Sequence, residues 1–175
     1  MISVVYVFWM FVILFGVIGA MRGWVKELLV SFSVIVGLTT NHVLVRYIPL
    51  VQSLPINSPS LFWIRSIIIV VLVFFGYQTI VSISRLAARA MRERLQDTLF
   101  GIVMGVFNGY LIIGTLLYYL FEANYPYPEI VSPPTGSVLE TVQIMMNWMP
   151  PHVLGEPGIY FAVLLCFIFV LVVFI

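Results

Sequence analysis

Four long apolar runs constrain this 175-residue chain more than any other feature. They cover residues 2–20, 28–45, 61–82 and 99–121, and as helices they are long enough to cross the roughly 30 Å hydrocarbon core of a bilayer. Only 9% of the residues are charged, against about 25% in soluble domains, so a soluble fold is excluded. The sequence therefore predicts an all-α, polytopic membrane helical bundle whose four-span core covers residues 1–121.

A proline-rich connection follows the fourth run and covers residues 122–158. Inside it, a capping-box pattern of Ser137 and Glu140 precedes apolar residues at helical spacing. The pattern predicts a short amphipathic helix over 137–149 that lies on the outer membrane surface, with partner docking as the alternative. Residues 159–175 are apolar again but barely long enough to span. We expect a fifth span there, a half-inserted helix, or a span whose natural tail is missing.

Gly101, Gly105 and Gly109 recur every four residues and share one face of the fourth predicted helix. Each glycine costs a helix about 1 kcal/mol relative to alanine, so three in register indicate a face where another helix approaches closely. We call these three residues the glycine seam, a glycine-zipper pattern. Asn108 lies beside the seam, where it can hydrogen-bond to another helix. Asp97 precedes it, where a carboxylate is favoured by a helix N-terminus or by a neighbouring arginine.

The link between the first two runs carries Arg22, Gly23, Lys26 and Glu27. Arg22 and Lys26 are four residues apart and share a helix face, and Glu27 can pair with either of them. The segment is either an interfacial turn with positive anchors or a polar cluster near a pathway or partner site.

The link between the third and fourth runs is the most charged part of the chain. Its arginines form a basic stripe expected to meet anionic headgroups or to set the topology, namely Arg85, Arg89, Arg92 and Arg94. With Arg22 and Lys26 they make six basic residues on one side of the membrane, against Arg46 and Arg65 on the other. Basic residues favour the cytoplasmic side, so residues 21–27 and 84–97 are predicted to be cytoplasmic. The N-terminus and residues 122–158 are then outside.

Composition and motifs argue against chemistry at a defined site. The net charge of +1 indicates no nucleic-acid partner, and the single Cys166 rules out a disulfide framework. The apolar runs lack paired aspartates, a Ser/His couple and an HExxH motif. We therefore expect no enzymatic activity, no catalytic residue, no cofactor, no metal and no small-molecule substrate. The expected partners are the lipid bilayer and either a second copy of the chain or a membrane transport or envelope protein.

Two segments together resemble the signatures of the colicin V production protein family. They are Arg22-Gly23-x-x-Lys26-Glu27 between two apolar runs, and Asp97-x-x-x-Gly101-x-x-x-Gly105-x-x-x-Gly109 at the start of the fourth. The resemblance covers about residues 1–121. It implies a bacterial inner-membrane protein linked to colicin V export and envelope maintenance, and it implies no reaction. The sequence has Thr98 and Asn108 where the family has arginines, so no role of those arginines is carried over.

Two functions remain open from the sequence. The first is a non-enzymatic accessory protein that packs against itself or against a transport or envelope machine. The alternative is a small channel or transporter component. A pathway would require polar residues of several spans to face inward together, namely Arg22, Lys26, Glu27, Arg65 and Asn108.

Overall fold

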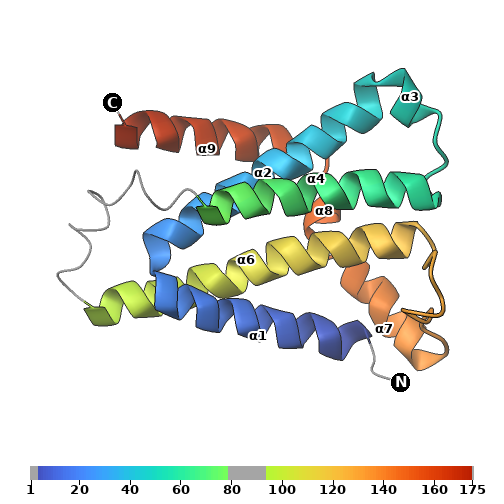
Figure 1. Ribbon diagram of the computed structural model, residues 1–175, viewed down its shortest axis with the longest axis horizontal. Helices are drawn as coiled ribbons and strands as arrows, with labels where there is room; N and C mark the ends of the chain where they lie inside the picture. Colours follow the sequence, from blue (N-terminus) through green and yellow to red (C-terminus); the bar gives the residue numbers. More distant parts are fainter. Residues whose placement is uncertain (1–3, 79–93, 175) are drawn as a thin grey trace.

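The computed structural model describes residues 4–78 and 94–174, and all regular structure in these two ranges is helical (Figure 1). The helices are α1 (Val4–Arg22), α2 (Trp24–Tyr47), α3 (Pro49–Gln52), α4 (Pro59–Gln78), α6 (Arg94–Glu122), α7 (Ser137–Met146), α8 (Pro150–Val153) and α9 (Gly158–Phe174). Helices α1, α2, α4 and α6 are long and apolar enough to cross a membrane. The predicted all-α membrane bundle is therefore confirmed.

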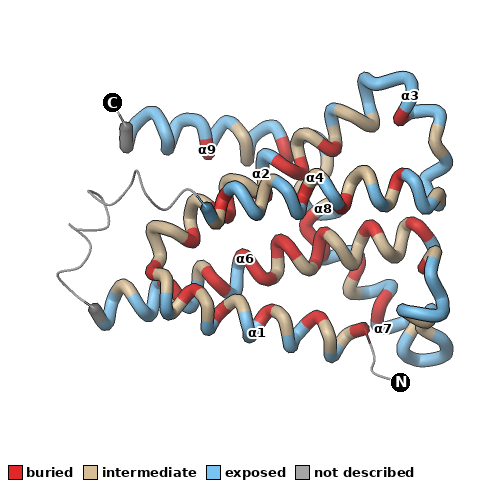
Figure 2. The backbone as a smooth tube through the Cα atoms, in the orientation of Figure 1, coloured by how far each residue is buried: buried red, intermediate tan, exposed pale blue. Residues whose placement is uncertain are grey.

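The four long helices run side by side, with consecutive helices in opposite directions (Figure 1). We call the end that holds the α1–α2 turn the turn end. The opposite end, where residues 123–136 leave α6, is the connection end. Helix α1 packs mainly on α6, and α2 packs on both α4 and α6. Buried residues face the interior between these helices, while the outward faces are exposed and apolar (Figure 2).

The glycine seam forms the contact between α1 and α6. A Cβ atom at Gly105 would lie 3.0 Å from the Cα of Gly19, and one at Gly109 would lie 2.9 Å from the Cα of Val12. Neither position has room for a side chain, because the obstacle is backbone that cannot rotate away. The close helix approach expected from the sequence is therefore present, and the helix that fills the seam is α1 of the same chain.

Helix α7 starts at residue 137 as predicted but differs from the prediction in length, capping and surroundings. It ends at Met146 rather than 149. Gly136, with φ of +60°, is its N-cap, and no side chain caps it, so the predicted capping box does not form. Val142 and Met146 are buried against α1 and α6. The apolar face predicted to lie on the membrane surface is therefore covered by the two helices of the glycine seam.

Helices α8 and α9 complete the chain. Pro150 at the start of α8 packs so closely on α6 that a Cβ at Gly114 would lie 2.9 Å from its Cδ. Helix α9 then runs antiparallel to α2, with the rings of Phe32 and Phe169 5.2 Å apart. Its 17 residues extend about 26 Å, so it is shorter than the four candidate spans.

Candidate functional site

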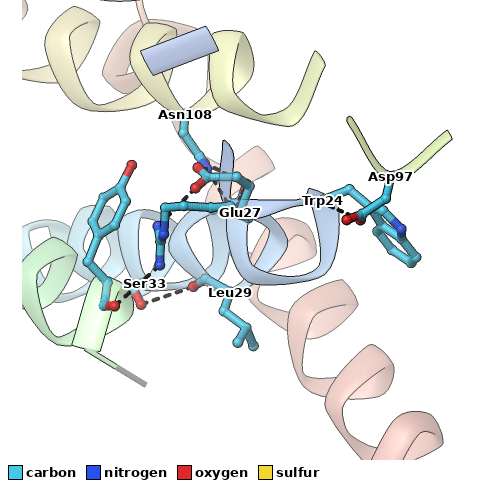
Figure 3. Close-up of polar contacts among 9 residues, drawn as sticks. Trp24, Glu27, Leu29, Ser33, Asp97 and Asn108 are labelled. Atoms are coloured by element: carbon cyan, nitrogen blue, oxygen red, sulfur yellow. Dashed lines mark hydrogen bonds and ion pairs between the residues drawn. The ribbon is translucent and has the colours of Figure 1, made fainter. Parts of the chain in front are cut away.

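The two signature segments meet at the turn end. Gly23 joins α1 to α2 with φ of +84°, a conformation that favours glycine. The carboxylate of Asp97, in the first turn of α6, accepts a hydrogen bond of 3.3 Å from the backbone N–H of Trp24 (Figure 3). A Cβ at Gly23 would lie 2.6 Å from the Oδ2 of Asp97. Asp97 therefore stabilises the N-terminus of α2, a helix other than its own.

Glu27 lies at the centre of a buried polar group one turn further along α2. Its side chain is fully buried, and its Oε1 accepts a 2.8 Å hydrogen bond from Nη1 of Arg22. Its Oε2 accepts another, also 2.8 Å, from Nδ2 of Asn108 on α6 (Figure 3). Burying a carboxylate is costly unless it is paired, and the hydrogen bonds from Arg22 and Asn108 offset that cost for Glu27. Of the two pairings open from the sequence, Glu27 adopts the one with Arg22.

Asn108 uses its whole amide to join α6 to α2. Its Nδ2 donates to the main-chain oxygen of Glu27 as well as to the carboxylate, at 2.8 Å in each case. Its Oδ1 accepts a 2.7 Å hydrogen bond from the hydroxyl of Ser31. The sequence expectation that Asn108 bonds to another helix is confirmed. We call Arg22, Glu27, Ser31 and Asn108 the signature cluster.

Arg22 extends the signature cluster to α4. Its guanidinium lies 4.2 Å from the ring centroid of Tyr77, and its Nη2 donates to the Tyr77 carbonyl at 3.2 Å. The cluster thus holds α1, α2, α4 and α6 together at one level. Lys26 stands apart, since it has no ion-pair partner within residues 4–78 and 94–174. Arg85, Arg89 and Arg92 lie outside the described residues, and Arg94 is the first residue of α6.

A second polar group lies at the connection end. Arg65 of α4 forms an ion pair of 2.7 Å with Glu122 of α6, and its guanidinium lies 3.9 Å from the ring centroid of Tyr119. Asn41 of α2 donates from Nδ2 to the Arg65 carbonyl at 3.0 Å and to the Tyr119 hydroxyl at 3.2 Å. Sequence reasoning missed the pairing with Glu122. The signal was that both residues occur near span ends on the same side of the predicted membrane.

Glu156, between α8 and α9, joins α9 to α2 at the surface. Its Oε1 lies 2.8 Å from Nε2 of His42, accepts from the hydroxyl of Tyr160 at 3.0 Å, and contacts the guanidinium of Arg46. Hydrogen bonds from Arg46, His42 and Tyr160, in that order, lower the pKa of Glu156 to about 2. The carboxylate is therefore charged over the whole physiological range.

An apolar layer separates the signature cluster from the polar group at the connection end. Ser31 and Asn41 are ten residues apart on α2, which is about 15 Å along the helix. The intervening space is filled by buried side chains, among them Val34, Leu38, Ile69, Leu111 and Ile112. The residues required to face one pathway are thus divided, with Arg65 at one end and Glu27 at the other. Across the described residues, no three His, Cys, Asp or Glu side chains gather as a metal site would require.

Comparison with known proteins adds the family. No curated protein and no solved structure matches the chain significantly. The family model described as colicin V production protein matches residues 5–139, about three quarters of the sequence. The match extends beyond residue 121, where the resemblance of the two signature segments ends. The matched range includes both signature segments and the contacts between them. The chain therefore belongs to the colicin V production protein family.

Proposed function

We propose that this protein is a non-enzymatic accessory protein of the bacterial inner membrane that supports toxin export or envelope maintenance through contacts with a partner. One observation carries the proposal. The polar side chains of the signature cluster form hydrogen bonds with one another between the helices. A catalytic or transport site would need polar groups that are free to bind a substrate or an ion. Their arrangement serves to fix the relative positions of those helices.

The orientation belongs to the same proposal. The end of α4 at Gln78 and the start of α6 at Arg94 lie at the turn end, beside the α1–α2 turn (Figure 1). The segments that carry the six basic residues are therefore connected to the same end of the bundle. Positive charge favours the cytoplasm, so the turn end is cytoplasmic and the connection end is outside.

A partner must use a surface other than the glycine seam, because α1 fills the seam. Exposed apolar faces remain on several helices, among them α1, α4, α6 and α9, and those of α4 and α6 are the candidates for partner contact. Val70 on α4 has an exposed fraction of 52% and Val103 on α6 one of 63%. In a bilayer these faces contact either lipid or another membrane helix.

Site-specific photocrosslinking in living cells tests the proposal. A small diazirine residue replaces Val70 or Val103, and the captured species are identified by mass spectrometry. We expect a discrete protein adduct, either the same chain or a transport or envelope protein. The matched control is Ile69, which is adjacent to Val70 but fully buried and should give only intramolecular products. Lipid adducts alone from both exposed positions would contradict partner contact at the α4 and α6 faces.

The channel or transporter alternative finds less support. It requires a connected polar path, and the described residues place an apolar layer of about 15 Å between the two polar groups. Ion and solute flux into liposomes that contain the purified protein is the measurement that separates the two functions. Flux above that of empty liposomes would favour the alternative.

A further inference from the structure

A half-enclosed cavity of about 240 Å³ lies at the connection end, between α2, α4, α6 and residues 151–159, which include the link from α8 to α9. It is far larger than the space that a single water needs. Polar side chains from three helices line it, namely Asn41, His42, Arg46, Arg65 and Tyr119. Leu154, directly after α8, and Ile159, in the first turn of α9, contribute to its apolar wall. The cavity is independent of the signature cluster and of the proposed accessory role.

Two buried atoms of the lining residues have no hydrogen-bond partner. Asn41 is 2% exposed; both hydrogens of its Nδ2 are used in bonds to Arg65 and Tyr119, while its Oδ1 accepts nothing. The Nε–H of Arg65 donates to nothing, although its Nη1 is paired with Glu122. A buried polar group left unpaired costs about 1–3 kcal/mol. The residues that line the cavity therefore include an unused acceptor and an unused cationic donor.

The charges around the cavity indicate the sign of its occupant. The lining includes two guanidinium groups and no carboxylate, and the imidazole of His42 is a further polar group. Glu122 and Glu156, the partners of Arg65 and Arg46, are not among the lining residues. The charged groups that line the cavity are therefore cationic hydrogen-bond donors, and each guanidinium shares its charge with a glutamate outside the lining.

We propose that this cavity binds an organic phosphate that carries hydroxyl groups, such as the glycerol phosphate unit of a lipid headgroup or the same unit as a free solute. The phosphate oxygens accept from Arg65 Nε–H and from Arg46, and a hydroxyl donates to Asn41 Oδ1. Both unpaired atoms are shielded from solvent. This binding mode therefore requires the Asn41 and Arg65 side chains to turn toward the cavity.

Native mass spectrometry of the detergent-purified full chain provides the first test. Short-chain phosphatidylglycerol is compared with phosphatidylcholine of the same chain length, whose headgroup is neutral overall and has no hydroxyl. Calorimetric titration with glycerol 3-phosphate then tests the free solute. We expect phosphatidylglycerol, glycerol 3-phosphate or both to bind, and phosphatidylcholine to bind at least several-fold more weakly. Equal binding of the two lipids, with no binding of glycerol 3-phosphate, would overturn the proposal.

Variants locate the site. Asn41→Asp keeps the side-chain size but places a negative charge beside the phosphate, and it should weaken binding by roughly tenfold or more. Asn147→Asp makes the same change at an exposed residue outside the cavity and should leave binding unaltered. Arg46→Gln, at the exposed rim, should weaken binding by about two- to five-fold and decides the matter if Asn41→Asp does not fold. If Asn41→Asp folds and binds the ligand with wild-type affinity, the ligand binds elsewhere and the proposal is overturned. If Asn41→Asp does not fold, wild-type affinity in Arg46→Gln has the same meaning.

Discussion

Asn108 is the residue on which most contacts of the signature cluster depend. In Asn108→Ala, Oε2 and the main-chain oxygen of Glu27 both lose a donor, and the Ser31 hydroxyl loses an acceptor. Leaving buried groups unpaired costs about 1–3 kcal/mol each, so we expect the free energy of unfolding to fall by at least about 2 kcal/mol. Reversible unfolding in mixed micelles with increasing sodium dodecyl sulfate measures the change.

Asn147→Ala is the matched control for this prediction. Asn147 is exposed at the end of α7, and its side chain makes none of the hydrogen bonds found in the described residues. A surface change of this kind alters stability by no more than about 0.5 kcal/mol. Equal losses in the two variants would show that the cluster contributes nothing beyond an ordinary surface residue.

Glu156 makes the attachment of α9 depend on pH. Its pKa falls from the ordinary value of 4.5 to about 2 in the folded protein, chiefly through Arg46. A group whose pKa is lowered by folding stabilises the fold above its ordinary pKa, and the contribution is lost as the pH falls through its folded value. The difference in unfolding midpoint between wild type and Glu156→Gln should therefore shrink as the pH falls from about 5 to about 2. A difference that stays constant over this range would contradict the assignment.

At the scale of single residues, the sequence indicated the contacts that are local and missed those that are not. Arg22 and Glu27 are close along the chain, so their pairing was one of two options. Asp97 bonds to Trp24, which is 73 residues away. That bond exists only because α1 and α6 pack closely enough to bring the first turn of α6 against the α1–α2 turn. Chain spacing alone carries no information about such a cross-helix contact.

Among the helices, α1 and α6 depend most on small residues. In Gly105→Leu, the new side chain would begin 3.0 Å from the Cα of Gly19, so the two helices must separate. Overpacking costs typically about 1–3 kcal/mol, and we expect a loss at the upper end of that range because backbone is the obstacle. The same micelle unfolding measurement, with disulfide crosslinking between cysteines placed in α1 and α6, reports the loss of contact.

Val103→Leu is the control on the same helix. Val103 is 63% exposed, so an added methylene meets no other part of this chain. We expect stability and α1–α6 crosslinking to match the wild type. If Gly105→Leu behaves in the same way, then α1 does not occupy the glycine seam in the membrane.

Helix α7 shows what element-scale patterns could and could not predict. The spacing of Val142 and Met146 correctly predicted an apolar face. It did not predict what covers that face, because the α1–α6 surface that receives it exists only after those helices have packed. The start at residue 137 was predicted correctly, but the capping box was wrong. Gly136 adopts positive φ just before Ser137, so the chain turns into the helix without using the serine as a cap.

The orientation of the whole molecule is the property that charge distribution predicts most directly. The basic residues near span ends divide six to two, and the structure brings the flanking residues of both basic segments to the turn end. Reversing Arg89 and Arg92 to glutamate leaves four basic residues at that end, because two of the six are removed. The preference for the cytoplasm should then weaken, since lysine and arginine set orientation while acidic residues contribute little.

Reporter fusions measure this preference. A reporter active only in the cytoplasm, inserted within residues 84–97, should lose part of its activity in the double variant. A reporter active only outside, fused after residue 135, should lose activity in parallel, because α6 then inserts in both orientations instead of one. Glu129→Gln, in the same connection as the second reporter, removes an acidic residue and should leave both activities unchanged. Full activity of both reporters in the double variant would mean that Arg22, Lys26, Arg85 and Arg94 are sufficient to hold the turn end inside, and that Arg89 and Arg92 serve another purpose.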